Sequence, residues 1–229
     1  MKLWIALLLP ILLFTGCNEK TEKGKEFAFS VLIPQPAAGQ SVHYIHGKQV
    51  FTSLSGDSAV SAMVINNPIM AGREAILAIA IENRTDGTIE LKWDDITFFN
   101  PKNYIKLLPV SEIEEYFKKP NRCKPMLNAK AFRRELEKYG VFHDPALDTQ
   151  KRELFPSEAA LLDIFKEIKE DLCYTRLPNN TTLEQHKVTV GYMVILLPAE
   201  NFERRMLFML KIPAAGTLHK LRYALQPLQ

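Results

Sequence analysis

The sequence predicts one α+β domain, an antiparallel β-sandwich with a helical insertion, preceded by a cleavable leader. Three observations predict it. Apolar residues alternate with other residues in short runs before residue 111 and after residue 187, as in strands with one buried face. The apolar period changes to that of helices between residues 111 and 172. The composition, 47% hydrophobic and 24% charged, is ordinary for a chain that forms a core.

Segment 1–16 has the composition of an export signal. Lys2 supplies a positive charge, and residues 3–14 form an apolar run of 12 residues that is broken only by Pro10. Such a run is too short for the hydrocarbon core of a bilayer, which needs about 20 helical residues. We therefore expect a signal peptide that is removed rather than folded.

The leader ends in Leu13-Phe14-Thr15-Gly16-Cys17. This ending resembles the lipobox of bacterial lipoproteins, whose pattern is Leu, small, small, Cys, with Phe14 where Leu is usual. The resemblance implies that Cys17 is lipidated and that a membrane of the cell envelope holds the protein through this anchor. Asn18, in place of Asp, favours the outer membrane with the domain facing the periplasm. An ordinary secretory signal that ends in Cys and an uncleaved membrane helix are the alternatives.

Residues 17–26 comprise the lipidated cysteine and a charged tether, which we expect to be flexible. A single domain is expected over residues 27–229. It begins with predicted strands at 27–33, 49–54 and 59–65, and residues 36–47 are predicted to form a loop.

The segment 74–99 carries the clearest strand pattern. Leu77, Ile79 and Ile81 alternate with smaller or polar residues, which predicts a strand with one buried face. The sequence Asn-Arg-Thr-Asp-Gly at 83–87 predicts a turn, since Asp-Gly tolerates positive φ. An alternating return strand follows, so we expect a hairpin here. Another short strand is predicted at 104–108.

A helical block is predicted over about residues 111–172. A capping box begins at Ser111, a helix at 128–139 stops at Gly140, and a helix at 157–172 has Ser157 as its N-cap. Strand patterns then resume at 188–196, 206–212 and 221–225.

Two cysteines remain after the leader ending, Cys123 and Cys173. An even pair in an oxidising compartment predicts a disulfide, which would close a loop of about 50 residues and contribute roughly 4 kcal/mol. Two unrelated buried thiols are the alternative.

The Asn-Arg-Thr-Asp-Gly hairpin and the closing strands from 191–195 to Leu225 resemble immunoglobulin-like domains of uncharacterised bacterial lipoproteins. The resemblance implies an antiparallel immunoglobulin-like β-sandwich. The helices between the strands depart from a plain immunoglobulin topology.

Catalytic and metal-binding patterns are weak. His43 and His46 are three residues apart, a spacing that sends strand side chains to opposite faces. The segment 55–58 offers two serines beside Asp57, but turns use these residues routinely. Asp94 and Asp95 could serve as a carboxylate pair, and a capped turn is the simpler interpretation. We predict no catalytic residue, no metal site and no cofactor.

The strongest charge feature is a run of eight bases and two acids between residues 118 and 138, a net charge of +6. The bases are Lys118, Lys119, Arg122, Lys124, Lys130, Arg133, Arg134 and Lys138. An anionic surface or an acidic envelope protein could dock there; a solvated helix face is the alternative. The whole chain carries only +3, too little to indicate nucleic acid.

Two classes of function remain open. The first is a lipid-anchored, non-enzymatic binding or assembly module of the cell envelope. The second is an envelope hydrolase whose active-site residues are dispersed along the sequence. A deep pocket with converging His, Asp or Ser would favour the second.

Overall fold

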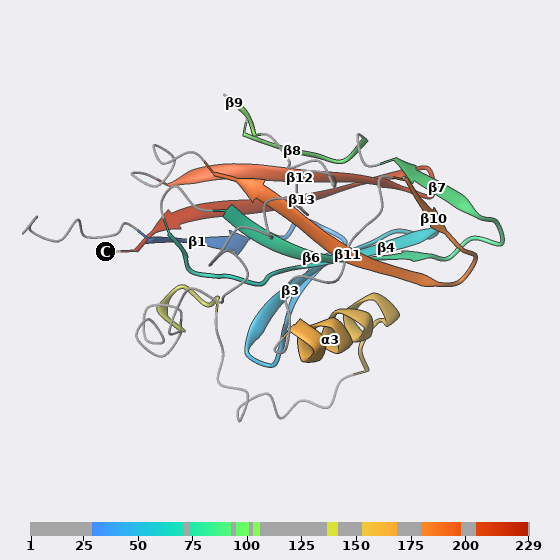
Figure 1. Cartoon of the computed structure of the whole chain (residues 1–229), viewed down its shortest axis with the longest axis horizontal. Coiled ribbons are helices and arrows are strands. Elements are labelled where there is room, and N and C mark those ends of the chain that lie inside the picture. Colours follow the sequence, from blue (N-terminus) through green and yellow to red (C-terminus); the bar gives the residue numbers. More distant parts are fainter. Residues whose placement is uncertain are drawn as a thin grey trace, which may run out of the picture.

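The computed structural model describes residues 29–70, 74–92, 95–100, 103–105, 137–141, 153–168, 180–197 and 205–228. Most of these residues belong to antiparallel strands in three sheets (Figure 1). The six-stranded sheet contains β1 (Phe29–Pro34), β5 (Ile69–Met70), β8 (Thr97–Asn100), β9 (Asn103–Ile105), β12 (Met206–Ala214) and β13 (Thr217–Pro227), in the order β5-β1-β13-β12-β8-β9.

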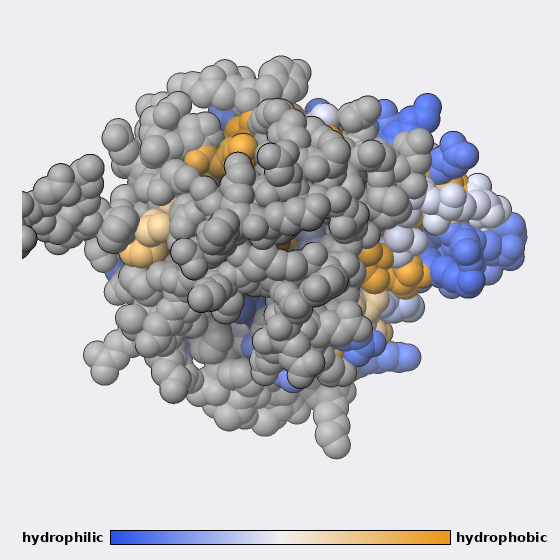
Figure 2. Space-filling model, viewed as in Figure 1, coloured by the Kyte–Doolittle hydropathy of each residue, from blue (hydrophilic) through white to orange (hydrophobic). Residues whose placement is uncertain are grey.

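The five-stranded sheet contains β2 (Gln40–Ile45), β3 (Lys48–Leu54), β4 (Ser58–Val64), β6 (Glu74–Asn83) and β11 (Val188–Leu196), in the order β11-β6-β4-β3-β2. A two-stranded sheet pairs β7 (Ile89–Lys92) with β10 (Asn180–Leu183). The end of the molecule where β7 and β10 lie is mainly hydrophilic (Figure 2).

The main core lies between the six-stranded and five-stranded sheets, which confirms the predicted antiparallel sandwich. Phe51 of β3 meets Tyr223 of β13 edge to face, with 5.4 Å between the ring centroids. Phe98 of β8 stacks on Phe208 of β12 at 5.3 Å. Such aromatic pairs contribute roughly 0.5–1.5 kcal/mol each beyond their area of burial. Apolar residues of both sheets therefore form one contiguous core.

A second core lies on the opposite face of the five-stranded sheet, beneath helix α3 (Pro156–Ile168). Helix α3 lies beside β4 and β6 (Figure 1). Leu161 of α3 is fully buried in one apolar cluster with Ala78 and Ala80 of β6. The prediction of one buried face for this strand is therefore wrong, because the small alanine side chains leave room for a helix on the second face. Strand β11 is likewise covered on both faces over most of its length.

Two tight hairpins are built on two-residue turns. His46 and Gly47 join β2 to β3 with φ of 48° and 76°, and Ala215 and Gly216 join β12 to β13 with 49° and 71°. Positive φ at both central residues matches the twist of antiparallel strands. The predicted loop at 36–47 is thus wrong for residues 40–45, which form β2. The prediction failed because β2 is an edge strand whose polar residues do not show a clear apolar alternation.

The predicted hairpin between β6 and β7 is also wrong. Strand β6 pairs with β4 and β11, whereas β7 pairs with β10. The cause lies in the fully buried Asn83, whose Nδ2 donates to the carbonyls of Gly87 (2.7 Å) and Leu183 (2.9 Å). Its Oδ1 accepts from the backbone N–H of Thr85 at 3.0 Å, which makes an Asx turn. This turn leads the chain into a different sheet, and Gly87 does not adopt positive φ.

Several sequence predictions fall outside the described residues: the leader, the tether, Cys17, Cys123, Cys173 and most of the helical block. The predicted stop at Gly140 is confirmed, since residues 137–138 are helical and Gly140 has a φ of 65°. Within the described part of the chain, no helix is both long and apolar enough to cross a membrane.

Candidate functional site

Polar side chains gather at one end of the hairpin formed by β3 and β4. Because successive strand residues point to opposite faces, they form one cluster on each side of the five-stranded sheet. Ser53 and Ser58 face the main core, whereas Thr52 and Ser61 face α3. All four side chains are buried.

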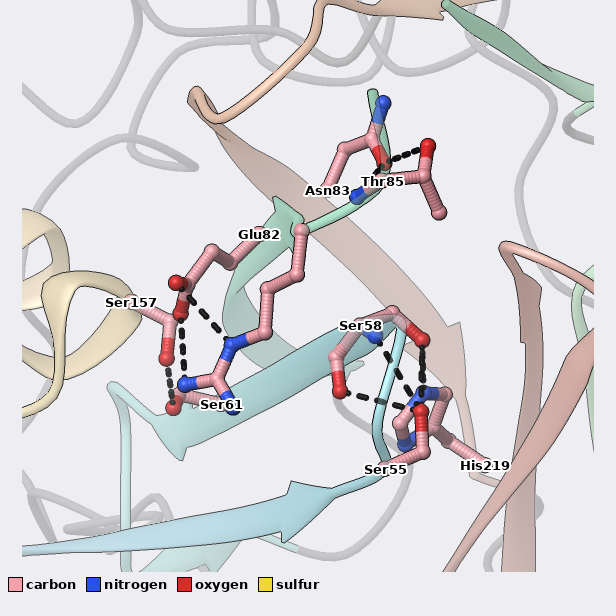
Figure 3. A network of polar contacts seen from close by, with 9 residues as sticks. Ser55, Ser58, Ser61, Glu82, Asn83, Thr85, Ser157 and His219 are labelled. Atoms are coloured by element: carbon pink, nitrogen blue, oxygen red, sulfur yellow. Dashed lines mark hydrogen bonds and ion pairs between the residues drawn. The ribbon is translucent and has the colours of Figure 1, made fainter. Parts of the chain in front are cut away.

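The first cluster is centred on His219 of β13 (Figure 3). Its Nε2 lies 2.8 Å from the hydroxyl of Ser58, and its Nδ1 lies 3.1 Å from the hydroxyl of Ser53. The Ser58 hydroxyl also donates to the carbonyl of Ala214 at 3.1 Å, and it lies 3.1 Å from the hydroxyl of Ser55. These contacts join β3 and β4 of one sheet to β12 and β13 of the other, so the cluster is a polar cross-link between the sheets.

Burial controls the charge of His219. Only 2% of the residue is exposed, and burial lowers the pKa of its imidazole to about 4, opposed by a hydrogen bond with the backbone of Ser53. The imidazole is therefore neutral at pH 7. A neutral histidine can serve as one donor and one acceptor, which suits contacts with two hydroxyls.

The contact between Ser58 and His219 has the spacing of an activated nucleophile and its base. In hydrolytic triads, a carboxylate usually orients the histidine through its second nitrogen. Here the hydroxyl of Ser53 occupies that place, and Ser58 has no exposed surface. In this structure the pair links β4 of one sheet to β13 of the other.

The second cluster fixes the start of α3 on the sheet. The hydroxyl of Thr52 donates to Glu158 Oε1 at 2.9 Å and lies 2.9 Å from the hydroxyl of Ser61. Ser61 in turn meets the hydroxyl of Ser157 at 2.8 Å (Figure 3). Ser157 and Glu158 are both fully buried.

Glu158 also determines how α3 begins. Its Oε2 accepts the backbone N–H of Phe155 at 3.2 Å, and Pro156 is the first helical residue. The N-cap prediction for Ser157 is therefore wrong, because Ser157 already lies inside the first turn and its hydroxyl contacts the sheet. A carboxylate in the first turn also complements the positive end of the helix dipole.

The predicted basic docking segment is represented by Lys138 alone, since the other seven bases lie outside the described residues. Lys138 is exposed, with its Nζ 5.4 Å from the centre of the Tyr139 ring. The adjoining carbonyl of Gly140 accepts hydrogen bonds from Tyr44 (2.6 Å) and from the side chain of Gln49. The C-terminal end of the basic segment is thus attached to the sandwich.

Val141 extends this attachment into the interior. It packs against Val31 of β1 and lines a small cavity of about 10 Å³ together with Gln49, Asn67 and Tyr223. That volume is room for about one water molecule.

The structure separates most of the other residues considered from the sequence. His43 lies on β2 and His46 in the following turn, Asp57 is exposed, and Asp95 follows β7. Across the described ranges, no group of three or more His, Cys, Asp or Glu side chains is placed to hold a metal ion.

The contact of His219 with Ser58 was missed from the sequence because the residues are 161 positions apart. One signal in the sequence could have found it. His219 is two and four residues before Leu221 and Tyr223, so in a strand its side chain points to the same apolar face as theirs.

Comparison of the chain with protein-family models, with curated proteins and with solved structures found no match.

Proposed function

We propose that this protein is a lipid-anchored, non-enzymatic binding or assembly module of the bacterial cell envelope, held on the outer membrane and facing the periplasm. The observation that carries the proposal is the sequence Leu13-Phe14-Thr15-Gly16-Cys17 at the end of a short apolar run. Two or three acyl chains on Cys17 would give stable anchoring, since each buried CH₂ contributes about 0.8 kcal/mol.

The described domain has the stable core expected of a module that binds partners through its surface. Its two sheets share a large apolar core. Hydrogen bonds among Ser53, Ser58 and His219, and from Ser58 to the carbonyl of Ala214, connect the two sheets. The antiparallel arrangement also supports an immunoglobulin-like sandwich, which we include in the proposal. The membrane is the first partner. An envelope protein or an anionic surface at the basic segment 118–138 is the second, and neither a cofactor nor a nucleic acid is part of the proposal.

The anchor is tested by replacing its attachment residue. Cys17→Ser should release the protein from the membrane fraction or leave an uncleaved precursor, because position 17 then lacks the thiol to which the lipid attaches. Fractionation of cells and the apparent mass on a denaturing gel measure both results. Cys123→Ser, tested alongside, should leave fractionation unchanged. A Cys17→Ser variant that fractionates and migrates like the unchanged protein would contradict the proposal.

One observation favours the second candidate function, an envelope hydrolase: the distance of 2.8 Å between Ser58 Oγ and His219 Nε2. A serine activated in this way should react with a fluorophosphonate probe. We expect no labelling of Ser58, because it is fully buried and bonded to the backbone. The measurement is the mass of the intact protein after exposure to the probe, with Ser58→Ala as the control. Labelling that disappears in Ser58→Ala would favour the hydrolase.

A further inference from the structure

The outward face of the hairpin β12–β13 combines exposed leucines with cations. Leu207 is 54% exposed and Leu218 is 46% exposed, whereas the alternating residues Phe208, Leu210 and Leu221 are buried in the main core. We call this surface the outer hairpin face; it comprises Leu207, Met209, Lys211, Leu218, Lys220 and Arg222. The face therefore offers two exposed apolar side chains together with three cations to another molecule.

The register places like charges together on this face. Lys211 lies directly opposite Lys220, and Arg222 lies opposite Met209 one pair further along. Like charges directly opposite one another destabilise a sheet. Lys211 is directed over the ring of Phe99 on β8, with its Nζ 4.4 Å from the ring centre. Repulsion between these cations therefore lowers the stability of the hairpin, and a bound anion would reduce that repulsion.

No acid of the same hairpin offsets these cations. Residues 205–228 contain Arg205, Lys211, Lys220 and Arg222 and neither Asp nor Glu, a formal charge of +4. Among the described residues, none of Lys211, Lys220 and Arg222 forms an ion pair with a carboxylate. The charge of this face is thus available to a partner.

We propose that the outer hairpin face docks on the headgroups of anionic phospholipids. The inference rests on the proposed lipid anchor. Eleven residues separate Cys17 from Phe29, where β1 begins, so the chain can span at most about 40 Å. Strand β1 is hydrogen-bonded to β13, so the tether joins the domain at the same sheet that carries the outer hairpin face. In Figure 1 the strands β8 and β12 lie on the opposite side of the molecule from α3.

The arrangement of the side chains favours a lipid surface. Leu207 and Leu218 lie near the two ends of the face, about 20 Å apart along the strands, with the three cations between them. The apolar stems of lysine and arginine can lie along the acyl boundary while their charges reach the phosphates. A flat sheet face can place all three charges at one depth.

The test uses the full-length lipidated protein carrying Leu218→Cys, reconstituted in two kinds of vesicle. One contains phosphatidylcholine alone, and the other contains about 30% phosphatidylglycerol, enough to give an anionic surface. A membrane-impermeant maleimide then labels position 218. The matched control is Asp163→Cys, at an exposed position on α3. Signal from the native cysteines is subtracted with the unchanged protein, and flotation of the vesicles reports the anchor independently.

We expect the protein to float with both vesicles, and labelling at 218 to be about tenfold slower on anionic vesicles than on neutral ones. Labelling at 163 should be alike on both. Reversing Lys220→Glu and Arg222→Glu should restore rapid labelling at 218, whereas Lys92→Glu on β7 should not.

Equal labelling at 218 on both vesicles, with normal flotation, would overturn the docking and leave the anchor intact. Flotation with anionic vesicles alone, together with protection at 218, would support the docking and contradict the anchor. A chain that floats with neither kind of vesicle would overturn both.

Discussion

At the scale of single residues, His219 shows how burial sets the chemistry of a side chain. Free histidine has an ordinary pKa near 6.5, but burial lowers the pKa of His219 to about 4. Between these values the unfolded chain binds more protons than the folded one, so stability rises with pH across this window. The stabilisation by neutral His219 is complete above about pH 6.5 and is lost as the pH falls towards 4.

We predict that this histidine makes the fold sensitive to mild acid. The free energy of unfolding should fall between pH 6.5 and pH 4, by at most about 3 kcal/mol from this residue. Urea denaturation at several pH values measures it, with His219→Gln expected to flatten the dependence in this window. His186→Gln is the matched control, since His186 lies in an exposed turn. An unchanged pH profile in His219→Gln would contradict the prediction.

At the scale of elements, α3 depends on a few polar contacts as well as on apolar packing. Glu158 accepts from both Thr52 on the sheet and the N–H of Phe155 at the helix start. Removing this buried acceptor takes one hydrogen-bond partner from each donor, and an unsatisfied buried donor costs about 1–3 kcal/mol. The attachment of α3 should therefore be sensitive to this one carboxylate.

We predict that Glu158→Ala lowers the free energy of unfolding by about 2 kcal/mol and loosens α3 before the sheets. Hydrogen exchange should accelerate in residues 156–168, while β4 and β6 stay protected. Glu153→Ala, at an exposed position just before the helix, should change neither quantity. Equal exchange rates in α3 of the Glu158→Ala variant and the unchanged protein would show that apolar packing alone holds the helix.

At the scale of the whole molecule, charge is distributed unevenly. Loss of Lys2 with the leader would lower the formal charge from +3 to +2, yet residues 118–138 alone carry +6, so the remainder of the mature chain carries −4. Such asymmetry can orient and accelerate association with an acidic partner, and salt weakens it, with a screening length of about 10 Å at 0.1 M.

We predict that reversing Arg133, Arg134 and Lys138 to Glu removes envelope partners that copurify at low salt. Circular dichroism checks that the fold is unchanged; Lys138, the one described residue of the three, is exposed. Reversing Lys92 and Lys187, which lie on another part of the surface, is the control. Unchanged partners and unchanged salt dependence would mean that the segment is only solvated.

Local sequence patterns predicted the existence of most strands. The alternation in residues 74–83 and 188–196 corresponds to β6 and β11, and the glycine stop at 140 is correct. The strand at 206–212 extends through Pro213 to Ala214, and the strand at 221–225 extends to 217–227. These features could be predicted because alternation along a strand and the geometry of a turn depend on neighbouring residues.

The sequence by itself determined the alternation of the strands, the basic segment and the pattern that ends in Cys17. Only the tertiary structure decided which strands pair, because pairing depends on packing between distant segments rather than on local alternation. Asn83 helps to pair β7 with β10, because its side chain donates a hydrogen bond to the carbonyl of Leu183, 100 residues away. His219 meets Ser58 across the core, and Ala80 is buried because α3 returns over β6. Each depends on a segment whose position is set by the whole fold.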